Sequence, residues 1–100
     1  MIYRLVIPKI GELKEIRLLA WSKQVGASIA KGDLIVELET DKALVEVRAG
    51  QAGYLRQTTC ENGSWYELGT LLGIVTAEPN DPIAAEIDGS PLLAMDFELV

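Results

Sequence analysis

The sequence predicts an all-β fold, a flattened barrel or sandwich of two four-stranded sheets with quasi-two-fold symmetry. Three observations favour this fold. Short apolar segments alternate with period two and are separated by turn residues at intervals of about eight to twelve positions. No segment combines helical periodicity with capping residues. Turn-and-strand units also recur 37 positions apart, as in the pairs Gly26 with Gly63 and Gly32 with Gly69.

The expected strands follow one another along the first 78 residues. The first strand stops at Pro8, because proline cannot donate to a sheet ladder. Gly32 suits a turn that needs positive φ. The expected strands are residues 3–7, 15–21, 34–39, 43–48, 54–58 and 71–75. Their alternation predicts a core of Leu18, Leu34, Val36, Leu38, Val45, Val47, Leu55, Leu71 and Val75.

The composition changes after Glu78, which divides the chain into a domain at 1–78 and a linker or C-terminal extension at 79–100. Prolines and acidic residues from Pro79 to Pro91 are typical of a linker. Residues 92–100 become apolar again, and three interpretations of them stay open: a linker stub, an extra strand on the sandwich, or a peptide for a partner.

Charge and residue usage exclude several function classes. The net charge of −6 and the pI of about 4.5 argue against nucleic acid and anionic membranes as partners. With Cys60 as the single cysteine and no histidine, the sequence offers no internal disulfide, zinc site or catalytic triad. We therefore expect no catalytic residue and no metal, and a reducing compartment. No apolar run approaches the ~20 residues of a membrane span.

A β-hairpin is the most informative local feature. Residues 34–38 and 44–48 alternate between apolar and polar side chains on either side of a short polar break. This pattern predicts a hairpin with Asp41 and Lys42 at its tip, where the Asp41 side chain can bond nearby backbone amides. Lys42 would then project into water on a short, stiff support. Taken alone, such a lysine is most often an ordinary solvated side chain.

The residues around this lysine change that interpretation. The string Glu-Thr-Asp-Lys-Ala at 39–43, preceded by Gly32-Asp33 and followed by Gly53, resembles the attachment motif of lipoyl domains. These domains belong to the biotinyl/lipoyl carrier family and occur in the dihydrolipoamide acyltransferase component of 2-oxoacid dehydrogenase complexes. The resemblance covers roughly residues 3–77 and implies a barrel-sandwich hybrid with lipoic acid covalently attached to Lys42. The residues implied in recognition around this site are Glu39, Thr40, Asp41, Ala43, Gly11 and Glu12.

The resemblance also implies partners. A lipoate ligase or lipoyltransferase would modify the lysine. The arm would then carry acyl groups and reducing equivalents between a thiamine-dependent 2-oxoacid decarboxylase, an acyltransferase core and dihydrolipoamide dehydrogenase. The domain itself would be a non-catalytic carrier, cytoplasmic or, in a eukaryote, in the mitochondrial matrix.

Two departures from the family pattern affect these expectations. The segment from Glu12 to Trp21 is one residue shorter than usual, with Ile16 where glycine is common, which leaves the partner enzymes open. Gly50 replaces a frequent proline, which we expect to loosen that corner.

Other carriers and an unmodified module are alternatives. Biotin carriers share the fold, but their motif places methionine on both sides of the lysine, whereas Asp41 and Ala43 flank Lys42 here. The hydrogen carrier of glycine cleavage is lipoylated too, but it is longer and differs at the position of Asp41. An unmodified interaction module on the same scaffold is the third alternative. The mass of the intact protein separates all of these.

Overall fold

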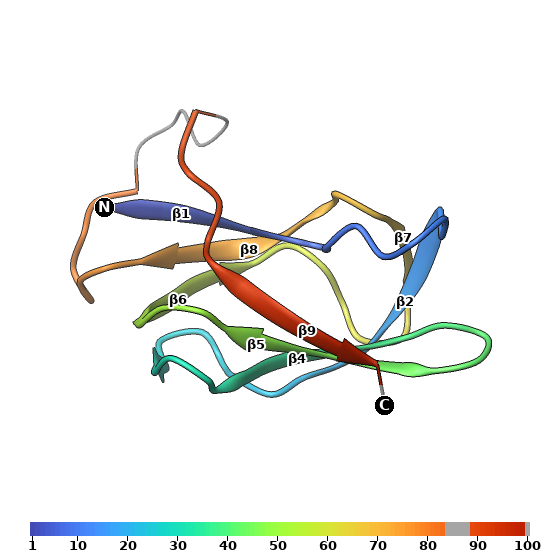
Figure 1. Ribbon diagram of the computed structural model, residues 1–100. Helices are drawn as coiled ribbons and strands as arrows, with labels where there is room; N and C mark the ends of the chain where they lie inside the picture. The colour runs from blue at the N-terminus through green and yellow to red at the C-terminus, as the bar shows by residue number, and fades with distance from the viewer. Residues whose placement is uncertain (84–88, 100) are drawn as a thin grey trace.

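A computed structural model describes residues 1–83 and 89–99, and these residues form strands and turns without a helix. The strands lie in two facing layers, with the chain passing repeatedly between them (Figure 1). The strands of the described part are β1 (Ile2–Val6), β2 (Glu15–Trp21), β3 (Ser28–Ile29), β4 (Leu34–Glu39), β5 (Leu44–Ala49), β6 (Gly53–Thr58), β7 (Trp65–Glu67), β8 (Leu71–Thr76) and β9 (Met95–Leu99).

Both sheets are antiparallel, and their strand orders are related. The four-stranded sheet has the order β1-β8-β6-β3, and the five-stranded sheet has the order β7-β2-β4-β5-β9. The all-β prediction is confirmed. The second sheet holds five strands rather than four because β9 adds to the edge of β5. Without β9, the two sheets correspond strand for strand, β1-β8-β6-β3 with β5-β4-β2-β7.

The glycines of the 37-residue repeat occupy equivalent turns. Gly26 and Gly63 have φ of 96° and 88°, and Gly32 and Gly69 have φ of 93° and 88°. Residues other than glycine rarely adopt φ values in this range, which explains why both halves have glycine at these turns. The repeat is therefore a repeat of backbone conformation as well as of sequence.

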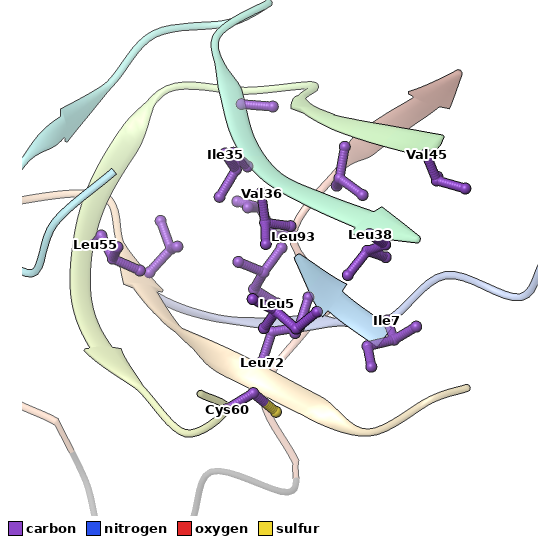
Figure 2. Packing of buried hydrophobic residues seen from close by; sticks show 14 of the residues in the cluster. Leu5, Ile7, Ile35, Val36, Leu38, Val45, Leu55, Cys60, Leu72 and Leu93 are labelled. Atoms are coloured by element: carbon purple, nitrogen blue, oxygen red, sulfur yellow. The ribbon is translucent and has the colours of Figure 1, made fainter. Parts of the chain in front are cut away.

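A single apolar cluster fills the space between the sheets (Figure 2). Seven of the nine predicted core residues are buried, but Leu34 and Leu71 are only half-buried. Ile35 and Leu72 take the fully buried places beside them. Register shifts cause this difference, between Leu34 and Val36 in the β4–β5 pair and at the Val6 end of the β1–β8 pair. A β-bulge inserts one residue and moves the alternation to the other face.

The C-terminal segment closes one side of the sandwich. Leu93 is 2% exposed and lies within the apolar cluster (Figure 2). Its backbone N–H donates to the carbonyl of Arg4 in β1 at 2.8 Å, and β9 then pairs with β5 from Met95 opposite Ala49 to Leu99 opposite Val45. Of the three interpretations of this segment, the structure has the docked strand. Glu86 and Asp88 of the expected linker, and Val100, lie outside the described residues.

Gly50 is where this segment meets the body of the sandwich. Its N–H donates to the carbonyl of Ala94 at 2.7 Å, and a Cβ at this position would lie 2.9 Å from the Ala94 carbonyl carbon. Proline would lack the donor and would clash with the Ala94 backbone. Gly50 therefore lets the C-terminal segment pack closely at this corner, and the expectation that it loosens the corner stays a prediction.

The hairpin and the N-terminus lie at opposite ends of the sandwich (Figure 1). At the N-terminal end, the Ala77 N–H donates to the Met1 carbonyl at 2.9 Å. The end of β8 therefore lies beside the start of β1 without a covalent connection. At the other end, β4 and β5 are joined through residues 40–43. Within the described residues, no helix is long and apolar enough to cross a membrane.

Candidate lysine-attachment site

The tip between β4 and β5 is held by the hydroxyl group of Thr40. The Thr40 Oγ1 accepts hydrogen bonds from the backbone N–H groups of Lys42 at 3.2 Å and Ala43 at 3.0 Å. The Thr40 N–H donates in turn to the Ala43 carbonyl at 2.9 Å. The sequence predicts such bonds from the Asp41 side chain, but Asp41 is exposed and its neighbour Thr40 accepts them instead.

Lys42 projects from this turn into solvent. Its side chain is exposed, and it takes part in none of the ion pairs found within residues 1–83 and 89–99. Glu39 and Leu44 form the pair next to the tip, and in the second pair Leu38 lies opposite Val45, both 0% exposed. The lysine amine therefore stands on a turn that is fixed by the Thr40 hydroxyl group and one backbone hydrogen bond, with a buried apolar pair two positions further along the strands.

The acidic residues near the tip differ in how far their charge is compensated. Glu39 accepts from Arg17 Nη1 at 3.1 Å, and Glu46 accepts from Arg48 Nη2 at 3.3 Å. Asp41 enters no such pair among the described residues. Partly exposed pairs of this kind add little stability, but they reduce the negative charge that Glu39 presents. Asp41 is thus the exposed carboxylate next to the lysine that has no counter-ion among the described residues.

The loop after β1 comes close to the tip, but through residues that we did not predict. A hollow of about 470 Å³ beside the hairpin is lined by Thr40, Asp41 and Lys42, together with Leu13, Glu15 and Trp65. Gly11 and Glu12, the loop residues expected to take part in recognition, are exposed and do not line this hollow. Leu13, Glu15 and Trp65 are far apart from the hairpin in sequence, and their local sequence carries no motif that could have identified them.

Cys60 has a structural environment. It is 4% exposed, and its thiol donates to the Leu71 carbonyl at 3.2 Å. Burial raises the pKa of the Cys60 thiol, which disfavours the reactive thiolate. The indole N–H of Trp21 donates to the Cys60 carbonyl at 3.0 Å. Among the described residues, no group of three or more histidine, cysteine, aspartate or glutamate side chains is arranged to hold a metal.

Comparison with known families adds to this geometry. The sequence model of the biotin/lipoyl family, described as "Biotin-requiring enzyme", matches residues 4–75. The match includes all of β2 to β7 and most of β1 and β8, and it contains the hairpin with Lys42. The chain belongs to this biotin/lipoyl family, and its resemblance to lipoyl domains is thereby confirmed.

Two similar curated proteins are acyltransferase components. The chain is 41% identical over 70 residues to the dihydrolipoyllysine-residue succinyltransferase component of the 2-oxoglutarate dehydrogenase complex of Staphylococcus saprophyticus, covering 69% of this chain and 16% of the relative. It is 39% identical over 75 residues to the acetyltransferase component of the acetoin cleaving system of Pseudomonas putida, covering 74% of this chain and 20% of the relative.

A third similar protein, from mouse, is named as a protein X component and not as an acyltransferase. The chain is 28% identical over 86 residues to the mitochondrial pyruvate dehydrogenase protein X component of Mus musculus, covering 84% of this chain and 17% of that protein. The chain thus spans between 16% and 20% of the length of these three relatives. The similarity concerns the biotin/lipoyl-type domain and not the remainder of those proteins.

Proposed function

We propose that Lys42 is the lipoyl attachment site and that the domain is a swinging-arm carrier in a 2-oxoacid dehydrogenase or related complex. The observation that carries this proposal is an exposed lysine amine, unpaired among the described residues, at the tip of a hairpin held by hydrogen bonds and flanked by Asp41 and Ala43. The relatives named above are components of 2-oxoglutarate dehydrogenase, acetoin-cleaving and pyruvate dehydrogenase systems, which supports the same class.

The residues of the tip suit an amide-linked arm. Amide formation removes the lysine charge, and no described ion pair is lost because Lys42 has none. Lipoic acid, when bound, supplies a dithiolane that can take up and release acyl groups and electrons. The chain's own contribution is to keep the amine in water at a fixed height, through the two bonds to Thr40 Oγ1. Attachment to the domain raises the effective concentration of the arm at each partner's active site.

The proposed partners follow from this role. A lipoate ligase or lipoyltransferase would recognise Lys42 with Glu39, Thr40, Asp41 and Ala43. A thiamine-dependent decarboxylase, an acyltransferase core and dihydrolipoamide dehydrogenase would use the arm in turn. The uncompensated carboxylate of Asp41 and the net charge of −6 favour basic docking surfaces on these enzymes. We propose a reducing compartment, the cytoplasm or the mitochondrial matrix, which suits a thiol kept free at Cys60.

Mass spectrometry tests this proposal directly. The chain is co-expressed with a lipoate ligase in the presence of lipoate, and the intact mass is measured. We expect one lipoyl increment in the parent and none in Lys42→Arg, which keeps a positive charge but replaces the amine with a guanidinium group. A lipoyl increment on Lys42→Arg would show that the attachment site lies elsewhere. A biotin increment after co-expression with a biotin ligase, without a lipoyl increment, would favour the biotin carrier instead.

A further inference from the structure

An apolar groove runs along the side of the sandwich next to the attachment site. It has a volume of about 770 Å³ and is bordered by the end of β1, the loop after it, the residues following β7, and the C-terminal segment. Its apolar lining includes Ile7, Pro8, Leu13, Leu68, Leu92 and Met95. Leu13 and Leu92 are 40% and 53% exposed, which is high for large aliphatic side chains and leaves the groove open to a ligand.

This groove adjoins the hollow at the hairpin tip. Leu13 and Glu15 line both spaces, and Lys42 lines the smaller one. A chain attached to the Lys42 amine can therefore pass along the Leu13 side chain from one space into the other. Because the guest would be covalently linked to the same domain, its effective concentration at the groove would be high without any binding partner.

The charges around the groove favour a neutral guest. Its charged lining residues are Lys9 and Lys14, with Glu15 and Glu67, two of each sign, and all four are exposed. A charged peptide would gain no net attraction here and would lose hydration on entering the apolar part. An alkyl chain with a neutral sulfur ring would lose little hydration and would remove apolar surface from water.

We propose that this groove is a resting site for the lipoyl group carried by Lys42 of the same chain. This inference rests on the proposed lipoylation of Lys42. Leu92 and Met95 form one wall of the site, and they belong to the C-terminal segment beyond residues 4–75, which the family model matches. The flexible thioether of Met95 can adapt to a sulfur ring. The arm exchanges between the groove and solvent, and a partner enzyme takes it from the solvent-exposed population.

The two methionines provide a reporter for this site. Met95 lines the groove, whereas Met1 lies at the opposite end of the sandwich and accepts a hydrogen bond from Tyr3. The full chain is labelled with ¹³C at the methionine methyl groups, and spectra are compared before and after lipoylation that mass spectrometry has verified. We expect the Met95 methyl signal to move and to show a nuclear Overhauser effect to the lipoyl ring protons, while the Met1 signal stays in place.

Matched variants distinguish a resting site from an indirect effect. In Leu92→Asp, which changes a residue that lines the groove but not the hollow at the tip, we expect the Met95 shift on lipoylation to fall at least threefold. Val25→Asp changes a residue of similar exposure, 59%, that lines neither space, and should leave the shift intact. The shift should also survive tenfold dilution, because the guest is on the same chain. Loss of the shift on dilution would assign the guest to a second copy and would overturn the inference.

The outcomes separate this inference from the proposed function. A lipoyl increment in the mass with an unmoved Met95 signal would overturn the resting site and leave the carrier role standing. Absence of the increment on the parent chain would overturn the carrier role, and the resting site with it.

Discussion

The two ends of the sandwich differ in how the ends of neighbouring strands are held. At one end, residues 40–43 join β4 to β5 covalently, and a neutral hydroxyl group on Thr40 holds the turn. At the other end, the equivalent strand β8 ends and β1 begins, with no covalent connection between them. There the Met1 ammonium group pairs with Asp81 at 2.7 Å, and Lys23 pairs with Asp33 at 3.0 Å. Glu39 also pairs with Arg17 beside the tip, but residues 40–43 themselves are held by the Thr40 hydroxyl group, whereas the ammonium group at the open end is held by an ion pair.

This difference suits a carrier. Charge pairs at an exposed surface weaken with salt and with pH. A turn held by backbone geometry and a neutral hydroxyl group does not depend on either. Lys42 therefore keeps its position under conditions that loosen the opposite end.

The largest effect is expected from Val45→Asp, which breaks the hairpin end from beneath. Val45 is 0% exposed opposite Leu38, and losing its burial costs roughly 1.5–3 kcal/mol before the cost of burying a carboxylate is added. We expect the domain to be unfolded without denaturant. Glu46→Ala, next along the strand, removes a half-buried ion pair with Arg48 and should cost less than about 1 kcal/mol. Circular dichroism without denaturant shows whether Val45→Asp is folded, and urea unfolding measures Glu46→Ala; equal stabilities of the two variants would refute the assigned strand register.

The second effect concerns the height and direction of the lysine. Exchanging the two tip residues, as Asp41→Lys with Lys42→Asp, keeps composition and net charge and leaves the backbone bonds to Thr40 available. We expect a folded protein that gains no lipoyl mass, because the amine leaves the tip in a different direction. Mass spectrometry after ligase treatment gives the result, with circular dichroism as the check on folding. A swap variant modified as fast as the parent would contradict a geometric reading of the tip by the ligase.

A smaller effect should follow from Thr40→Val, which removes the hydroxyl group at nearly constant volume. The N–H groups of Lys42 and Ala43 lose their acceptor, and we expect a loss of about 1 kcal/mol in unfolding free energy. The rate of lipoylation should fall severalfold because the tip becomes less ordered. Thr40→Ser keeps the oxygen and should modify at a rate close to that of the parent. If Thr40→Val were also unchanged in rate, the hydroxyl group would not be what orders the tip.

The smallest effect is expected at the open end. The pKa of Asp33 is lowered, first by the hydrogen bond from the Ala30 N–H and then by Lys23. Its carboxylate therefore stabilises the fold above the ordinary pKa of 3.8, and this contribution is lost as pH falls through the lower folded value. Asp33→Asn should show a slightly flatter decline of stability below pH 4 in urea unfolding. A decline identical to that of the parent would show that Asp33 does not contribute to the loss of stability at low pH.

Features that depend on local sequence were predictable, and those that depend on distant contacts were not. Glycine positions located the repeated turns, and alternation located the hairpin, because both effects act within a few residues. Ile35 was missed as a core residue because a β-bulge changed the face of the strand after Leu34. The approach of Leu13 and Trp65 to the tip depends on how β2 and β7 pair, which alternation does not specify.

The C-terminal strand had a signal in the sequence that is clear only with the structure. Gly50 stands where related domains often have proline, and its missing side chain admits the backbone of Ala94. A departure from the family pattern at that corner thus marked the place where extra chain packs. The exposed residues of β9, in contrast, show only an alternation of apolar and polar residues. This pattern fits a linker stub, an extra strand and a peptide for a partner equally well.

The direction of β9 determines how the molecule can be held in an experiment. Leu99 lies opposite Val45, so the strand runs toward the end that bears Lys42 (Figure 1). A purification tag or surface linker fused beyond residue 99 would leave beside the lysine and crowd any enzyme that approaches it. The same linker placed before Met1 would leave from the far end and present the lysine outward. Immobilised assays of modification should therefore give higher rates with the handle at the N-terminus.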